Sequence, residues 1–307
     1  MRQRVGERYS RETPPVAGSP TAPGGTTGPQ GVMWGRIEGE HTRVEPDHST
    51  TGSRWQADQF KMQAGLDGLF VDNGAGRLFG GFTFQYSQAS ASVRSFYGNG
   101  RISTEGYSLG ATLSWLGSNG FYVDAQTQMS LYSSKLRSGL AGRLANSNSA
   151  LGYAVGVEAG QRFALDGDWS LTPQAQLVYS SIDVQSFTDR FGARVKLGKG
   201  DSLTGRLGLA IDYRSTRKDE DGRPIRSSLY GIANLYHEFL DKTDVSLSGT
   251  RLRSTSDQLW GSIGLGGALS WDDDRIAIFG EVSARASLAN LSDSYSYKGT
   301  AGLRIRW

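Results

Sequence analysis

Histidines and carboxylates that lie close together are the first candidates for chemistry in this chain. It contains three histidines, His41, His48 and His237. A hydrolytic site would need a histidine beside a carboxylate or a serine, so that the ring can take up and return a proton. His41 precedes Glu45 and Asp47 by a few residues, which is the arrangement that such a site would use. Histidines near acids are common on protein surfaces, so we expect no catalytic residues and no enzyme.

Metal and cofactor sites are the next candidates, and their signals are weak. Asp272-Asp273-Asp274 looks like a metal cluster, but a three-residue acidic turn is more often simply solvated. The Gly264-Leu265-Gly266 segment has the pattern of a strand, whereas a phosphate-binding glycine turn precedes a helix. The chain has no cysteine, which excludes disulfides and thiolate ligands. We expect no metal and no cofactor.

The elements that must position these residues are strands, and the carboxyl terminus shows their pattern. In residues 297–307 the odd positions are apolar or small and end on Trp307, while Lys298, Arg304 and Arg306 share the other parity. Side chains of a strand alternate between two faces, so one face is apolar and the other charged. The same alternation predicts strands at 32–42, 58–71, 77–93, 101–116, 120–134, 149–165, 169–182, 201–214, 226–240, 244–253, 258–271, 275–288 and 294–307.

The length of these strands and the rhythm of their connections favour a membrane barrel. Strands of globular proteins average ~5 to 6 residues, whereas tilted membrane-spanning strands need ~9 to 11. Tight turns are expected at 72–76, 117–120, 166–168 and 272–274, and longer polar connections at 43–57, 94–100, 135–148, 183–200 and 289–293. Bacterial outer-membrane barrels have short periplasmic turns and longer external loops. Segment 244–253 breaks the up-and-down order, so we assign it to an external excursion.

The fold class is therefore an all-β, 12-stranded antiparallel transmembrane barrel of the outer membrane. Aromatic residues support this because many of them flank the short-turn side, where rings favour the headgroup level. They are Phe70, Trp115, Phe121, Trp169, Trp271 and Trp307. Mean hydropathy is low, at -0.42, and no stretch approaches the ~20 apolar residues of a spanning helix. Barrel strands keep average hydropathy low because polar residues alternate with apolar ones.

Placing the apolar parity outward turns a set of charges toward the interior of the barrel. Mixed charges in an interior need water or partners. They either stiffen the lumen or line a conduit that holds a plug, and both alternatives remain open. The lumen-lining charges are Arg36, Glu38, Asp124, Glu158, Arg162, Arg206, Asp212, Glu281, Arg285 and Arg304.

The amino-terminal residues 1–30 differ from the rest of the chain, because they hold five of the eight prolines. Such a segment does not build a core, and we expect a linker that can occupy the lumen, with a short helix in its first ten residues. Residues 31–307 are the barrel domain. The charged start lacks the apolar region of a secretory signal, so we expect the chain to be the carboxyl-terminal piece of a larger precursor. A net charge of +3 without a basic block argues against a nucleic-acid partner.

Several short segments resemble the translocator domain of autotransporters, the type V secretion proteins. The resemblance covers residues 31–307. It is carried by Gly31-Val32-Met33-Trp34-Gly35-Arg36, Glu105-Gly106-Tyr107-Ser108-Leu109-Gly110, Gly120-Phe121-Tyr122-Val123-Asp124, Phe191-Gly192-Ala193-Arg194-Val195, Leu203-Thr204-Gly205-Arg206-Leu207-Gly208, Asn234-Leu235-Tyr236-His237-Glu238-Phe239 and Gly302-Leu303-Arg304-Ile305-Arg306-Trp307.

The resemblance implies a virulence-associated monomer in the outer membrane of a Gram-negative bacterium that exports or anchors an amino-terminal passenger. It further implies periplasmic chaperones, outer-membrane lipid and the barrel-assembly machinery as partners. That machinery would recognise a terminal signal formed by Tyr297, Leu303, Ile305 and Trp307. Some relatives cleave the passenger at an asparagine inside the lumen, but this chain has no asparagine before Asn73.

Three alternatives compete with the translocator. A porin-like diffusion channel would conduct ions steadily. A loop-mediated surface adhesin would bind host components through loops 183–200 and 240–257. A hydrolase at the rim would lose its activity in a His41→Ala variant.

Overall fold

The computed structural model describes residues 31–46, 48–188, 192, 194–197, 200–240, 242–247, 250–255, 257–272 and 274–307. Among these residues, no helix is long and apolar enough to cross a membrane. The linker and the short helix predicted for residues 1–30 lie outside the described part.

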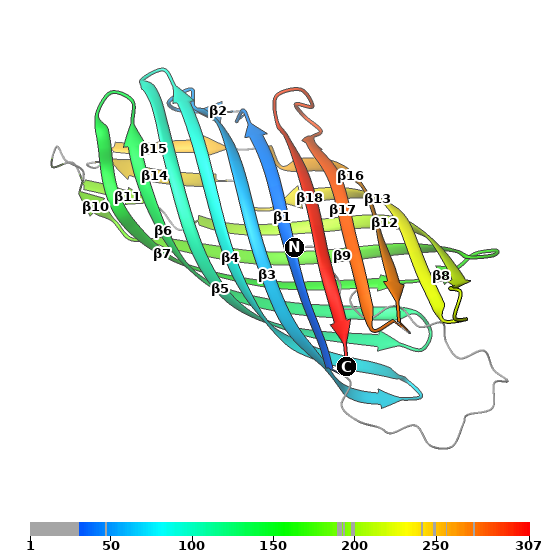
Figure 1. Ribbon diagram of the computed structural model, residues 1–307. Coiled ribbons are helices and arrows are strands. Elements are labelled where there is room, and N and C mark those ends of the chain that lie inside the picture. The colour runs from blue at the N-terminus through cyan, green and yellow to red at the C-terminus, as the bar shows by residue number, and fades with distance from the viewer. Residues whose placement is uncertain are drawn as a thin grey trace.

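Twelve long strands form one closed antiparallel barrel, as the sequence predicts (Figure 1). Each strand pairs with its neighbours along the chain, and the last strand returns to the first. The twelve are β1 (Gly31–Val44), β3 (Arg54–Asn73), β4 (Gly76–Ser95), β5 (Gly98–Gly117), β6 (Phe121–Ser138), β7 (Gly142–Gln161), β9 (Trp169–Val184), β12 (Gly200–Lys218), β13 (Pro224–Glu238), β16 (Leu259–Trp271), β17 (Ile276–Ser287) and β18 (Tyr295–Arg306). The two-residue β8 (Phe163–Ala164) extends the sheet beside β9.

The barrel closes where β18 pairs with β1. The register runs through twelve residue pairs, from Val32 opposite Arg306 to Arg43 opposite Tyr295. Beyond the ladder, the backbone N–H of Trp307 donates to the carbonyl of Gly31 at 3.2 Å. A Cβ on Gly31 would lie 2.6 Å from ring atoms of Trp307, so only glycine leaves room for this indole. Figure 1 shows β18 running to the carboxyl terminus at the end of the barrel that carries the short turns.

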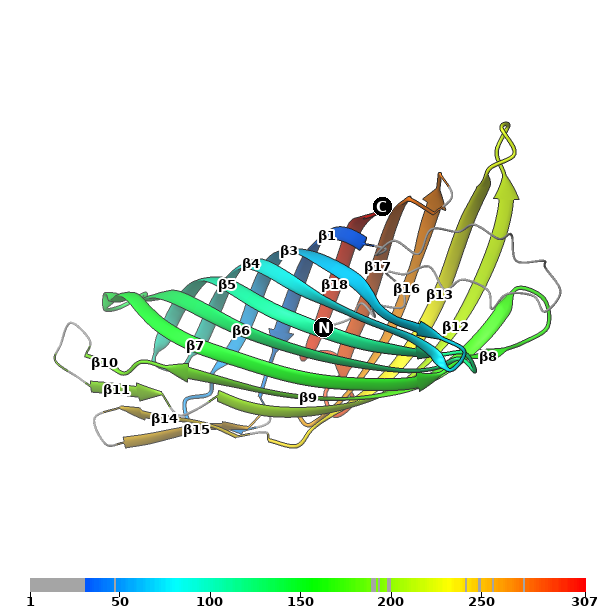
Figure 2. The ribbon, with the colours of Figure 1, turned by 90° about the horizontal axis from the view of Figure 1, so that it is seen from below.

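Segment 244–253 lies outside the barrel, as expected. It forms most of a hairpin of β14 (Lys242–Leu247) and β15 (Thr250–Thr255). This hairpin belongs to a second sheet with the order β10 (Phe187–Thr188), β11 (Arg194–Leu197), β14, β15 and β2 (His48–Ser49). Figure 2 shows β10, β11, β14 and β15 gathered at one end of the barrel. Three separate external connections are thus joined into one sheet.

Two of the predicted long connections are wrong. Segments 94–100 and 135–148 are mostly strand, because β4 and β5 meet at the two-residue turn Phe96-Tyr97 and β6 and β7 are separated only by residues 139–141. Their small and polar residues continue the ladder beyond the apolar band, so that β4, β5 and β7 each reach 20 residues. These segments are polar on both faces, which favours loops in a sequence-based prediction. A strand can nevertheless continue there, because its backbone hydrogen bonds need no apolar face where both sides of the sheet meet water.

The outer surface carries an apolar band between two aromatic belts. At the short-turn end Phe70 is 67% exposed and Trp307 60% exposed. At the other end tyrosines pair on the outer face, with ring centroids 5.2 Å apart for Tyr86 and Tyr107. Similar pairs join Tyr153 to Tyr179 and Tyr295 to Tyr297. Trp307, which directly follows β18, lies ten residues beyond Tyr297 and shares its parity. At ~3.3 Å per residue and a tilt of ~45° this distance spans about 23 Å. That height matches the apolar band of an outer-membrane barrel.

Candidate functional site in the barrel lumen

The predicted lumen charges share the inward face of the barrel. Five of them are buried, namely Glu38, Asp124, Glu158, Arg206 and Arg304. The other five are half-buried, namely Arg36, Arg162, Asp212, Glu281 and Arg285. They alternate with exposed apolar neighbours, as in β12, where Arg206 is 3% exposed and Leu207 63% exposed. This burial follows the period-two parity of the strands from which the lumen charges are predicted.

The central cluster of the lumen is built around an ion pair. The Arg206 guanidinium binds the Glu158 carboxylate, and the two side chains are 2% and 5% exposed. The Tyr122 hydroxyl donates to the other oxygen of Glu158 at 2.7 Å. Arg206 also donates to the side-chain oxygens of Gln174, Gln176 and Asn234 at 3.1, 3.1 and 3.0 Å. These contacts cross-link five consecutive strands of the barrel, β6, β7, β9, β12 and β13. A buried ion pair loses its hydration, and hydrogen bonds of this kind offset that loss.

A second cluster crosses the seam where the barrel closes. Glu38 on β1 accepts a hydrogen bond from the Lys61 ammonium of β3 at 2.9 Å and lies 3.9 Å from that of Lys298 on β18. Two residues further along β1, Glu40 accepts a hydrogen bond from the Ser296 hydroxyl at 2.7 Å. The first strand is therefore tied to both neighbours by side chains as well as by its backbone ladders.

A third cluster lies on β13, β16 and β17. The Tyr230 hydroxyl donates to Glu281 at 2.6 Å. The Arg285 guanidinium stands over the rings of Tyr236 and Trp260, 4.6 and 4.7 Å from their centroids. Cation–π contacts of this kind hold an arginine without neutralising its charge. The Arg285 guanidinium therefore keeps its positive charge between two aromatic rings of the lumen wall.

An apolar cluster inside the lumen is the part that sequence reasoning missed. Val32, Trp34 and Phe79 are 0%, 2% and 3% exposed, and the half-buried Leu69 and Leu116 pack against them. The Trp34 indole N–H donates to the Asp67 carboxylate at 2.8 Å. All of these lie toward the short-turn end of their strands. The parity that Trp34 shares with Arg36 is the signal that could have found this cluster, because Arg36 is one of the predicted lumen charges.

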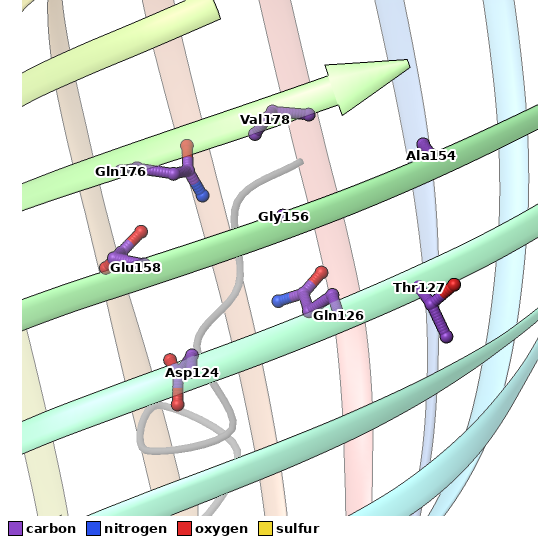
Figure 3. A pocket seen from close by; sticks show the side chains of 8 residues that line it. All are labelled: Asp124, Gln126, Thr127, Ala154, Gly156, Glu158, Gln176 and Val178. Atoms are coloured by element: carbon purple, nitrogen blue, oxygen red, sulfur yellow. The ribbon is translucent and has the colours of Figure 1, made fainter. Parts of the chain in front are cut away.

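A shallow pocket opens in the lumen wall beside the central cluster (Figure 3). Asp124, Gln126, Glu158 and Gln176 supply its polar side chains from β6, β7 and β9. Ala154 and Gly156 of β7 also line it. Thr127 and Val178 complete the lining. The pocket presents amide and carboxylate groups to the interior.

The residues considered for catalysis and metal binding are not brought together into one site. His41 lies on the outer face, and its Nδ1 is 2.7 Å from a carboxylate oxygen of Asp58, a partner the sequence did not suggest. The expected partner Glu45 instead faces Arg54 at 4.0 Å, and Asp47 lies outside the described residues. In the acidic turn, Asp274 is buried and bound by Arg226, which corrects the expectation of a solvated turn. Within the described ranges, acids and histidines form no group that could hold a metal.

The four residues proposed as a terminal signal lie on the lipid-facing side of β18. Tyr297, Leu303 and Trp307 are 58%, 43% and 60% exposed, and Ile305 is half-buried. All four have the same parity in the terminal segment that pairs with β1 and closes the barrel. Their exposure is consistent with contact to lipid once the barrel is inserted.

Comparison with known proteins agrees with this architecture. Residues 33–283 match the family model described as the autotransporter beta-domain. The chain is 41% identical over 308 residues to the adhesin BmaC autotransporter of Brucella suis, covering 100% of this chain and 9% of that protein. It is 26% identical over 186 residues to the BrkA autotransporter of Bordetella pertussis, covering 60% of this chain and 18% of that protein. The chain therefore spans less than a fifth of either relative.

Solved structures show the same fold. The transport unit of the autotransporter AIDA-I from Escherichia coli superimposes with a TM-score of 0.76 at 17% identity, covering 90% of each chain. The translocator domain of NalP from Neisseria meningitidis superimposes with a TM-score of 0.69 at 14% identity, covering 92% of this chain and 90% of that one. The family match over most of the chain and the closed barrel lead to one conclusion: this chain belongs to the autotransporter beta-domain family and is an integral outer-membrane β-barrel that serves as the translocator of a passenger.

Proposed function

We propose that the paired charges of the lumen form the wall of a hydrated conduit that holds the segment preceding β1 and thereby anchors the passenger. The observation that carries this is the central cluster around Arg206 and Glu158. In this cluster the ion pair and its hydrogen bonds join side chains of β6, β7, β9, β12 and β13 within the lumen wall. A wall of paired charges and amides can solvate the peptide groups of an enclosed chain, which an apolar lumen could not do.

The direction of the conduit follows from the position of Gly31. This residue begins β1 at the short-turn end, and short turns face the periplasm in barrels of this kind. A preceding chain must therefore cross the lumen to reach the cell surface. Thirty extended residues reach about 100 Å, and a flexible coil of that length spans about 30 Å, so residues 1–30 are long enough in either state. We assign residues 1–30 to the linker and residues 31–307 to the barrel domain.

The terminal strand supports a proposed role in assembly. Tyr297, Leu303, Ile305 and Trp307 would be the signal read by the barrel-assembly machinery, because β18 must pair with β1 to complete the barrel. Periplasmic chaperones would protect the apolar faces of the strands before insertion. Since β1 and β18 of the same chain close the sheet, the barrel would work as a monomer.

The barrel itself is proposed to be non-enzymatic. The buried Glu158 carboxylate is paired with Arg206 within the wall, and His41 lies on the outer face beside Asp58. The Brucella relative is named an adhesin. We propose accordingly that this barrel presents an amino-terminal passenger at the surface, and that any binding or catalytic activity belongs to the passenger.

Surface display tests this proposal. Residues 1–307 are expressed behind a secretory signal with an epitope tag before Met1, and intact cells are probed with antibody and protease. The tag should be accessible, while a matched tag inserted in the short turn between β5 and β6, at Ser118-Asn119, should remain protected. A protected amino-terminal tag on a correctly assembled barrel would contradict the translocator. Steady conductance unaffected by deletion of residues 1–30 would then favour a diffusion channel, and binding by the isolated barrel would favour a loop adhesin.

A further inference from the structure

Six basic residues gather on the outer face of one side of the barrel, beyond the apolar band. We call them the basic belt: Arg54 on β3, Arg94 on β4, Arg101 on β5, Lys135 and Arg137 on β6, and Arg143 on β7. All six are exposed. Five of them lie on parts of these strands that the sequence predicted to be loops, and Arg101 lies at the start of the predicted strand 101–116. The belt is therefore held by a rigid ladder and not by flexible connections.

The register of the sheet sets these charges directly against one another. Arg54 is opposite Arg94, Arg101 is opposite Arg137, and Arg137 is opposite Arg143. Like charges directly opposite on one face of a sheet are destabilising. Within the described residues, the six side chains form one ion pair, between Arg54 and Glu45 at 4.0 Å. Folding alone does not account for such a row, which indicates that an anion from outside the chain neutralises it.

The belt is continuous with the surface that faces lipid. On the same face, Tyr107 of β5 and Leu131 of β6 are 55% and 65% exposed and belong to the outer edge of the apolar band. Arg101 lies six residues beyond Tyr107 on β5, which at ~3.3 Å per residue and a tilt of ~40° is about 15 Å further from the membrane centre. Lys135 lies four residues beyond Leu131 on β6. The belt thus faces sideways, at and just above headgroup level.

We propose that the basic belt binds the phosphate groups of the glycolipid that surrounds the barrel in the outer leaflet. Arginine pairs with phosphate through two parallel charge-assisted hydrogen bonds, and a row of arginines suits a surface of repeated phosphates. A soluble sulfated polysaccharide offers similar anions, but it would approach from above. A belt that faces sideways and continues the lipid-facing surface favours lipid. This inference depends on the outer-membrane location of the barrel and not on its passenger.

The test uses the full chain refolded in zwitterionic detergent and titrated with purified lipopolysaccharide that carries its core phosphates. The belt variant is Arg101→Gln/Arg137→Gln/Arg143→Gln. The control variant, Arg217→Gln/Lys218→Gln/Arg275→Gln, loses the same charge from exposed positions near the short-turn end. A shift in electrophoretic mobility between unheated and heated samples confirms that each variant is folded. We expect binding to weaken at least tenfold in the belt variant, to change less than twofold in the control, and to fall with salt.

Two further probes distinguish the source of the anion. Dephosphorylated lipopolysaccharide should bind at least tenfold more weakly than the phosphorylated form. Heparin, a soluble sulfated polysaccharide, should compete poorly. Unchanged binding by the belt variant, equal losses in both variants, or heparin binding tighter than lipopolysaccharide would each overturn the proposal.

A single substitution keeps the proposal testable if the triple variant does not fold. Arg137→Gln relieves two like-charge contacts, so it should raise the thermal unfolding midpoint in detergent without lipopolysaccharide. The same variant should gain less stability than wild type when lipopolysaccharide is added. A gain from lipopolysaccharide equal to that of wild type would show that Arg137 does not contact phosphate and would overturn the proposal.

Discussion

Arg206 and Glu158 meet inside the barrel across an intervening strand. Arg206 lies on β12 and Glu158 on β7, and β9 runs between them and contributes Gln174 and Gln176 to the same cluster. The ion pair is therefore a cross-link of the lumen wall that backbone pairing does not provide. It draws three strands together on the concave side, where charges from every second strand can approach one another.

Removing one partner of this pair should weaken the barrel strongly. Arg206→Ala leaves the Glu158 carboxylate buried without its guanidinium, and breaking a buried pair typically costs ~3 to 5 kcal/mol. We expect a lower denaturant midpoint for unfolding in detergent micelles. The double variant Arg206→Met/Glu158→Gln should recover part of the loss. The exposed Arg217→Ala is the matched control, and an equal loss there would show that the pair is not a cross-link.

The closing seam depends on Glu38. In a Glu38→Gln variant, Lys61 and Lys298 lose the carboxylate that lies between them, so the three neighbouring strands β1, β3 and β18 should hold together less tightly. We expect the temperature at which the folded electrophoretic band disappears to fall, and to rise again with added salt that screens the two lysines. Glu105→Gln, at an exposed position, is the control. A Glu38→Gln variant as heat-resistant as wild type would contradict this role.

The apolar cluster at the short-turn end of the lumen should limit ion flow. Trp34→Ala removes an indole that is 2% exposed, which typically costs ~3 to 5 kcal/mol and leaves a cavity. We expect lower stability together with a larger single-channel conductance in planar bilayers. Met33→Ala, next to it on the lipid face and 46% exposed, should change neither by a comparable amount. Equal conductance of the two variants would assign Trp34 to stability alone.

The terminal aromatic residue should be needed for assembly. Trp307→Asp places a charge at the lipid-facing position of the strand that closes the barrel, and truncation after Leu303 removes the end of the ladder with β1. We expect both changes to abolish the heat-modifiable outer-membrane form in cells, whereas Trp307→Phe retains it. Normal amounts of folded Trp307→Asp barrel in the outer membrane would contradict the proposed signal.

The same period-two alternation that predicted the barrel also explains where the prediction was wrong. It predicts an inward direction for ten charges, because side-chain direction depends only on parity within a strand, and the structure has five of them buried and five half-buried. It ended β4 and β6 too early and began β5 and β7 too late, because beyond the apolar band both faces are polar and the alternation disappears. It made no prediction for Trp34 and Phe79, which share the parity of the inward-facing residues of their strands and are buried.

The sequence by itself determined the number of barrel strands and which residues of each strand share a face, since both are local properties of an alternating chain. Only the tertiary structure decided which charges meet. Glu158 and Arg206 are 48 residues apart, and Arg101, Arg137 and Arg143 form a row only through the registers of β5, β6 and β7. Register and closure depend on every strand at once, because a slip of one residue in any ladder would move each partner to the opposite face.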